Sequence, residues 1–142
     1  KNAVKVPAAL LAVSGVVAKL LPGLPTIKLD VSAISRDPEI VAKYKTDPLV
    51  YNGGTKARFG TELLASGDYV LTRASGIKLP TLIMHGTADR IADFSGSQKL
   101  FDSLSSTDKT LKMFNGYYHE ILNDVGKAAV YQEVVNWLEK HL

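Results

Sequence analysis

Two side chains with complementary proton chemistry follow two short apolar runs of the sequence. Asp89 comes shortly after residues 79–84, and His119 comes shortly after residues 109–114. A carboxylate can accept the Nδ1–H of a histidine and stabilise the imidazolium, which prepares the imidazole to act as a general base. This chemistry requires the two loops to lie at the same edge of a sheet. Asp89 and His119 are therefore the candidate acid–base pair.

The surrounding pattern predicts the elements that would bring the pair together. Residues 79–84 are almost continuously apolar, as in a parallel strand that is covered on both faces. Residues 97–104 fit a helix that turns Leu100, Phe101 and Leu104 toward the sheet, and residues 109–114 fit a second strand. Two strands joined by a helix make a right-handed βαβ unit, whose carboxyl edge is where open α/β sheets build their sites.

Other interpretations of these residues stay open at this point. A loop aspartate that caps the next helix or pairs with Arg90 explains Asp89 about as well as an acid does. Asp93 is an alternative acid, although it is better placed to begin the following helix. His85 is expected to pack inside or to bond backbone, and His141 receives no function. No serine stands in a Gly-x-Ser-x-Gly context, so no nucleophile is assigned.

The sequence predicts that the remainder of the chain is mostly helical. Residues 8–21 form an apolar helix that is too short to span a bilayer, which needs about 20 residues. A buried or half-buried helix is favoured there over an interfacial one. Residues 22–38 are expected to be a loop, and Asp37 with Pro38 is expected to start a short helix. Residues 55–74 and 124–142 fit longer helices with apolar stripes.

Composition limits the classes of function. The chain has 142 residues, a net charge of +3 and no cysteine. Its basic residues are scattered, which argues against nucleic-acid binding. The three histidines lack zinc-ligand spacing, so we expect no metal and no cofactor. Two strands cannot form a stable sheet alone, so the chain is interpreted as half of an α/β fold.

The sequence resembles the monoacylglycerol lipase family of α/β-hydrolases, which includes the lysophospholipase and serine aminopeptidase-like groups. The similarity is carried by five segments in order, which are residues 21–25 (Leu-Pro-Gly-Leu-Pro), 34–38 (Ile-Ser-Arg-Asp-Pro), 44–49 (Tyr-Lys-Thr-Asp-Pro-Leu), 82–90 (Leu-Ile-Met-His-Gly-Thr-Ala-Asp-Arg) and 118–120 (Tyr-His-Glu). The second and third segments are much more specific to this family than the His-Gly-x-x-Asp pattern, which many α/β-hydrolases share.

The resemblance implies a partial α/β-hydrolase fold, with a mostly helical cap in residues 1–75 and the C-terminal part of the core in residues 76–142. It implies that Asp89 is the acid of a Ser-Asp-His triad and His119 its base, with Tyr44 near the alcohol end of the substrate pocket. The substrate would be monoacylglycerol or a similar lipid ester, and the protein would be cytoplasmic or peripherally associated with a membrane.

The sequence departs from the family pattern because it contains neither the Gly-x-Ser-x-Gly nor the oxyanion His-Gly that precede the cap. The resemblance therefore implies that the partner of this chain is the missing N-terminal half of the fold. The chain alone should be inactive. Within the class, the alternatives are another esterase or a lysophospholipase. Outside the class, the alternative is a stand-alone acyl-binding or interaction domain without catalysis, which retains Asp89 and His119 as relics. In the lipase interpretation, the helix at residues 8–21 belongs to the cap, shapes the acyl tunnel and is a candidate for peripheral contact with lipid.

Overall fold

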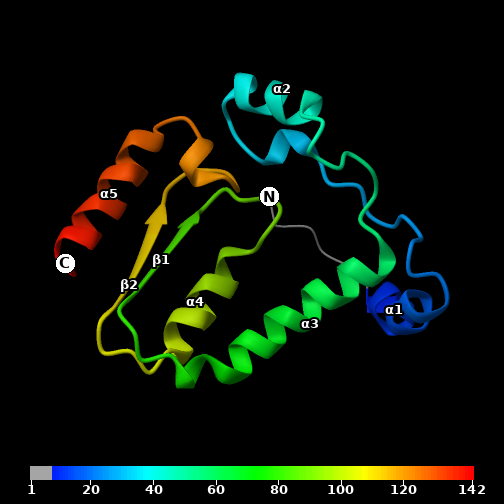
Figure 1. Cartoon of the computed structure of the whole chain (residues 1–142), viewed down its shortest axis with the longest axis horizontal. Helices are drawn as coiled ribbons and strands as arrows, with labels where there is room; N and C mark the ends of the chain where they lie inside the picture. The colour runs from blue at the N-terminus through cyan, green and yellow to red at the C-terminus, as the bar shows by residue number, and fades with distance from the viewer. Residues whose placement is uncertain (1–7) are drawn as a thin grey trace.

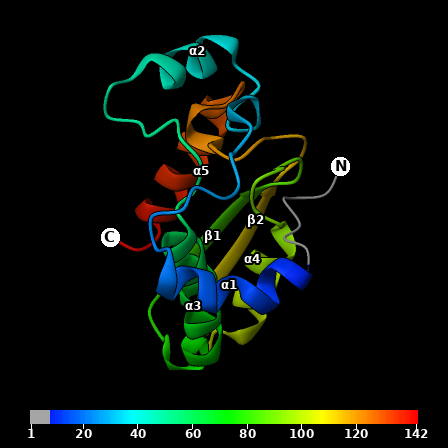
Figure 2. The same cartoon turned by 90° about the vertical axis from the view of Figure 1, so that its right-hand side faces the viewer.

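The architecture is a two-stranded parallel sheet with a helix on either side and further helices that lie away from the strands (Figures 1 and 2). The computed structural model describes residues 8–142. In chain order the elements are α1 (Ala8–Leu20), the 3₁₀ turn η1 (Val31–Ala33), α2 (Pro38–Thr46), α3 (Ala57–Arg73), η2 (Ala74–Gly76), β1 (Thr81–Gly86), α4 (Phe94–Ser103), β2 (Lys109–Phe114), η3 (Ile121–Asn123) and α5 (Lys127–Glu139). The predicted strand–helix–strand order is present as β1, α4 and β2.

The two strands end at the same level, which places the loops that follow them side by side. Thr81 pairs with Lys109 at the start of the ladder, and Gly86 pairs with Phe114 at its end. In Figure 1 both arrows point to the same edge, and α2 lies beyond it. The first strand was predicted to begin at Leu79, which is wrong because β1 begins at Thr81. Leu79 lies before the strand and is 74% exposed. The ladder begins after Pro80, because proline has no N–H to donate to a neighbouring strand.

The core lies between α4 and the sheet. Ala74, Ile83 and Leu104 are buried together, and Leu100, Phe101 and Leu111 pack against them. The prediction that α4 turns Leu100 and Phe101 toward the sheet is confirmed. In Figure 1 the strands lie between α4 and α5. Burial of these apolar side chains holds β1 and β2 in place, and with them the loops that leave the carboxyl edge.

Two aspartates start helices as the sequence predicted. The side chain of Asp37 accepts the backbone N–H of Glu39 at 2.9 Å, and Pro38 occupies the first helical position of α2. Asp93 accepts the N–H of Ser95 at 2.9 Å and begins α4. Each carboxylate satisfies one of the backbone donors that a helix leaves open at its N-terminus.

The last helix begins later, and ends earlier, than the range predicted for it. The prediction covered residues 124–142, whereas α5 runs from Lys127 to Glu139. Gly126 has φ +87°, a left-handed conformation that a right-handed helix cannot include. Asp124 therefore lies outside the helix, where its side chain can bond other segments.

Much of the apolar surface of the long helices faces solvent in this chain. Phe59, Leu63 and Val70 on α3 are exposed, as are Val135 and Leu138 on α5. A two-stranded sheet offers too little area to cover both helices, which fits the expectation that the unit belongs to a larger sheet.

Candidate active site

The carboxylate of Asp89 is held rigidly at the carboxyl edge of β1. Its Oδ1 accepts the backbone N–H of Ile91 at 2.7 Å and that of Ala92 at 3.0 Å. Its side chain is only 2% exposed. These bonds close a tight turn within the acid loop, residues 87–93, and fix the rotation of the carboxylate. The second oxygen, Oδ2, is then aimed at the loop that follows β2.

His119 meets that second oxygen. Its Nδ1 lies 2.8 Å from Asp89 Oδ2. Because a carboxylate only accepts, Nδ1 carries the hydrogen, and in the neutral ring Nε2 is the nitrogen that can take up a proton. The His119 side chain is 40% exposed, so a proton donor can reach it from outside the Asp89 pocket. The structure thus brings together the two residues that were predicted to meet.

The electrostatics of the pair favour a carboxylate beside a basic imidazole. Burial is the largest effect on Asp89 and by itself raises its pKa. The hydrogen bonds from His119, Ala92 and Ile91 outweigh that effect, so the pKa of Asp89 lies below its ordinary value. The hydrogen bond to Asp89 in turn raises the pKa of His119 above its ordinary value, although burial opposes this. Asp89 therefore stays ionised and strengthens His119 as a base.

A second imidazole approaches the same carboxylate. His85, in β1, places Nε2 3.2 Å from Asp89 Oδ2 and 3.4 Å from the carbonyl of Ala92. Both neighbours are acceptors, so Nε2 holds the hydrogen, and Nδ1 accepts from the Ser97 hydroxyl at 2.8 Å. The bond to backbone agrees with one of the two roles expected for His85. Its contact with the candidate acid was not predicted, although the i, i+4 spacing of the two residues was visible in the sequence.

Gly86 allows the two loops to lie in contact. A Cβ at this position would collide with the backbone carbonyl oxygens of Tyr117 and Tyr118. The backbone N–H of Ala88 donates to the carbonyl of Tyr117 at 3.0 Å. The Thr87 hydroxyl accepts from the N–H of Gly116 at 2.8 Å. The acid loop and the histidine loop, residues 115–120, are therefore joined by a backbone hydrogen bond and by the Thr87 hydroxyl.

The third predicted site residue lies elsewhere. Tyr44 is half-buried on α2. In the described part of the chain, no hydrogen bond joins Tyr44 to Asp89 or His119. Within residues 8–142, no three or more His, Cys, Asp or Glu side chains are arranged so that they could hold a metal ion.

Comparison with known proteins gives the family of the chain that carries this acid–base pair. The family model described as "Serine aminopeptidase, S33" matches residues 1–126. The chain belongs to this family. A monoacylglycerol lipase of Mycolicibacterium smegmatis is 41% identical to this S33-family chain over 133 residues, which are 94% of this chain and 48% of that protein. A monoglyceride lipase of Rattus norvegicus is 34% identical over 125 residues, which are 87% of this chain and 41% of that protein.

A solved structure shows the same fold. The crystal structure of Paleococcus ferrophilus monoacylglycerol lipase superposes with a TM-score of 0.87 at 33% identity, and covers 100% of this chain and 56% of that one. The S33-family chain therefore has a partial α/β-hydrolase fold, as predicted. It spans about half the length of the relatives it matches.

Next to the acid loop, the S33-family chain has an apolar cavity of about 260 Å³ between α1 and α3, which is open to solvent where Phe59 and Leu63 are exposed. Its apolar lining includes Val17, Ile27, Leu29, Phe59, Leu63 and Leu64. Ile91, two residues after Asp89, also lines it and so connects the cavity to the candidate site. A cavity of this kind suits an apolar ligand that ends near the acid–base pair.

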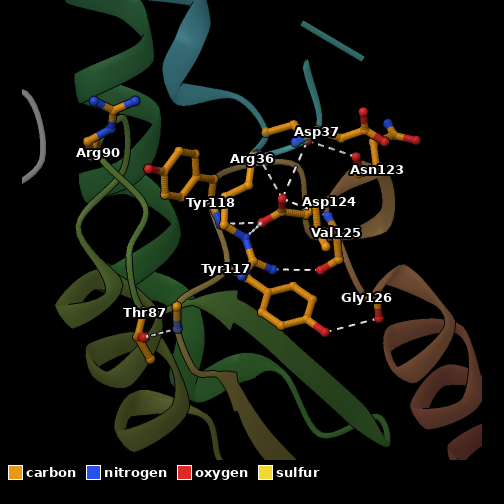
Figure 3. Close-up of polar contacts among 12 residues, drawn as sticks. Arg36, Asp37, Thr87, Arg90, Tyr117, Tyr118, Asn123, Asp124, Val125 and Gly126 are labelled. Carbon is orange, nitrogen blue, oxygen red and sulfur yellow. Dashed lines mark hydrogen bonds and ion pairs between the residues drawn. The ribbon is translucent and has the colours of Figure 1, made fainter. Parts of the chain in front are cut away.

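Sequence reasoning missed one residue that shapes the site. Asp124 is 1% exposed and sits at the centre of a network that reaches the histidine loop (Figure 3). The only local signal was an acidic residue shortly before a helix, which more commonly marks a cap. Its partners are distant in sequence, so its role could not be predicted from spacing.

Proposed function

We propose that this chain carries the acid and the base of a serine ester hydrolase that cleaves monoacylglycerol to a fatty acid and glycerol. The observation that supports this most directly is the 2.8 Å contact between Asp89 Oδ2 and His119 Nδ1, with Asp89 Oδ1 held by two backbone N–H groups. That geometry fixes the tautomer in which Nε2 can accept a proton. The lipase names of the relatives supply the class of substrate.

In the proposed reaction a serine outside these 142 residues attacks the ester carbonyl. His119 Nε2 takes the serine proton as the new C–O bond forms, and Asp89 stabilises the imidazolium. The proton then passes to the glycerol oxygen as the ester bond breaks, leaving an acyl-serine. Water next gives a proton to His119 and its oxygen to the acyl carbon. The proton returns to the serine as the fatty acid departs.

The substrate would lie across both predicted parts of the chain. Most of the apolar cavity is built from residues 1–75, the proposed cap, whose first seven residues lie outside the described part. Ile91 comes from the proposed core, residues 76–142. The cavity has the chemistry to hold an acyl chain with its ester near His119. Tyr44 is assigned to the alcohol end on the family resemblance.

Contact with a lipid surface is proposed for α1. Val16 and Leu20 on this helix are exposed, and Lys19 lies in its last turn. Apolar and basic side chains together suit the boundary of an anionic lipid layer. No helix in residues 8–142 has the length and hydrophobicity needed to cross a bilayer.

A fluorophosphonate probe tests the proposal on the natural protein that carries this chain. Intact mass is measured before and after labelling, and the labelled residue is mapped by peptide sequencing. We expect one adduct on a serine outside residues 1–142 and release of fatty acid from monoacylglycerol. The isolated 142 residues serve as the control and should gain nothing.

The same experiment separates the alternatives. A protein that labels but prefers lysophospholipid or another ester would keep the hydrolase class and change the leaving group. A protein that gains no adduct and hydrolyses no ester would overturn the enzyme proposal and favour a non-catalytic acyl-binding domain.

A further inference from the structure

The loop that carries His119 is anchored on both sides of the histidine. The backbone N–H of Tyr118 donates to Asp124 Oδ2 at 2.7 Å. The backbone N–H of Glu120 donates to the carbonyl of Ile34 at 2.8 Å. Neither anchor belongs to the strands or to the acid loop. Both lead to the segment that follows η1, far from the histidine in the sequence.

Asp124 connects that segment to the loop. Its Oδ1 accepts the backbone N–H of Arg36 at 2.8 Å and that of Val125 at 2.8 Å, and its Oδ2 accepts Arg36 Nε at 3.0 Å. The guanidinium reaches further and donates through Nη2 to the carbonyl of Val125 at 2.6 Å. Figure 3 shows the carboxylate at the centre of these bonds. The carboxylate thus joins residues 35–36, the histidine loop and the start of α5.

Arg36 also contacts the histidine loop through the aromatic ring of Tyr117. Its guanidinium carbon lies 4.4 Å from the centre of the Tyr117 ring. The Tyr117 hydroxyl donates to the carbonyl of Gly126 at 3.0 Å. The residue two positions before His119 is therefore held by a cation–π contact and a hydrogen bond. The arrangement uses the planar fork of arginine, which lysine cannot reproduce.

Because the Asp124 carboxylate is buried, the loss of any of its hydrogen bonds would leave a polar group without a partner. Burial is the largest effect on the Asp124 carboxyl and raises its pKa, but the N–H groups of Tyr118, Arg36 and Val125 and the Arg36 guanidinium outweigh it. The pKa of Asp124 lies below its ordinary value, so the group stays ionised. A neutral amide there would present an N–H₂ group where either Tyr118 N–H or Arg36 N–H now donates.

We propose that Asp124, with Arg36, is a positioning residue for His119: the pair ties the histidine loop to residues 34–36 and so keeps the imidazole in register with Asp89. The inference rests on the proposed function for its consequence in catalysis. It also has a consequence that does not depend on catalysis, which is the environment of the His119 ring. It further couples residues 1–75 to the base of the reaction, since Arg36 and Ile34 belong to that part.

The variants are Asp124→Asn, Arg36→Lys and their combination, made in the natural protein that carries this chain. Glu133→Gln is the matched control, because Glu133 forms an ion pair with Lys112 at 2.9 Å that touches neither loop. Each is measured for Tm, for kcat and KM with monoacylglycerol well below its Tm, and for the His119 titration by NMR.

We expect Asp124→Asn and Arg36→Lys to lower kcat about 10- to 100-fold, as small misplacements of a catalytic group do, while KM changes less. The double variant should lose no more than Asp124→Asn alone, because both remove one network. The His119 titration midpoint should move in both single variants. Glu133→Gln should leave kcat and the titration within about twofold of the parent.

Lower Tm with unchanged kcat and an unchanged His119 titration would overturn the inference and leave Asp124 with a structural role alone. If Asp124→Asn does not fold, Arg36→Lys carries the same test with the charge retained. A parent protein that hydrolyses no ester would defeat the proposed function instead. In that case the His119 titration in the variants still decides whether Asp124 and Arg36 position the ring.

Discussion

The imidazoles of His85 and His119 converge on one carboxylate oxygen, at 3.2 Å and 2.8 Å from Asp89 Oδ2. His119 comes from the loop after β2, whereas His85 belongs to β1 and is fixed by Ser97 of α4. The other oxygen is occupied by backbone N–H groups. Every direction from which Asp89 could be stabilised as an anion is therefore used, which suits a group that must remain charged beside a base.

Asp89→Asn should lower kcat by roughly 10⁴ with little loss of stability. The amide oxygen can keep the bonds from Ile91 and Ala92, but its N–H₂ group then faces His119 and favours the wrong tautomer. The measurement is kcat with monoacylglycerol beside Tm. Asp93→Asn is the control, because asparagine also caps helices well and α4 should remain intact. A fully active Asp89→Asn protein would exclude Asp89 as the acid and direct attention to Asp93.

The activity should depend on pH through His119. The pKa of His119 is raised, mainly by the hydrogen bond that its Nδ1–H donates to Asp89, and the protonated ring cannot act as a base. We therefore expect kcat/KM to rise with pH through a midpoint above 6.5, the ordinary value for histidine. In Asp89→Asn the two contributions of Asp89 are lost and only the charge of Glu120 still opposes the burial that lowers the pKa of His119, so its NMR titration midpoint should fall. An unchanged midpoint in that variant would show that Asp89 does not set the basicity of His119.

Gly86→Ala should separate the two loops. The new methyl group would meet the carbonyl oxygens of Tyr117 and Tyr118, and the histidine loop would have to move. We expect a loss of about 1–3 kcal/mol in the free energy of unfolding and a lower kcat below Tm. Chemical denaturation and steady-state kinetics measure both.

Gly96→Ala is the matched control for this substitution. Gly96 lies in α4 with nothing within 4 Å of an added Cβ, so alanine there should stabilise the protein by about 0.5–1 kcal/mol. If Gly86→Ala behaved like Gly96→Ala, the close approach of the loops would have no energetic weight.

Leu63→Trp should change the choice of acyl chain. Leu63 lines the apolar cavity, and the larger indole side chain of tryptophan would fill part of the volume of the cavity. We expect kcat/KM for a long-chain monoacylglycerol to fall about tenfold relative to a butyryl ester, because each buried methylene carries a measurable share of binding. Leu49→Trp is the control, since Leu49 is 93% exposed and is not in the cavity lining. Equal losses of kcat/KM for the two esters would show that this cavity does not recognise the acyl chain.

Sequence reasoning predicted interactions between residues that are close in the sequence, or that a rule of sheet topology brings together, and it missed the others. Asp37 and Asp93 were identifiable as caps because a cap bonds a residue two positions away. The meeting of Asp89 and His119 was predictable because parallel strands fix which loops are neighbours. These inferences need only local patterns and one topological rule.

The Asp124 network could not be predicted in this way. Its partner Arg36 is 88 positions away, and a single sequence carries no signal for that pairing. The predicted range of the last helix, residues 124–142, also extended across Gly126, whose positive φ was not evident from residue type alone. Both errors arise where tertiary contacts, rather than periodicity, decide the local structure.

The separation of Arg36 from Asp124 also bears on the order of folding. Bonding them closes a loop that contains α2, α3, β1, α4 and β2. The entropy of closing so long a loop is recovered only when the intervening chain is already compact. The strand–helix–strand unit has much shorter closures and should form first. The junction that holds the base would then be made in one of the last steps of folding, so its loss should chiefly accelerate unfolding while leaving the folding rate nearly unchanged.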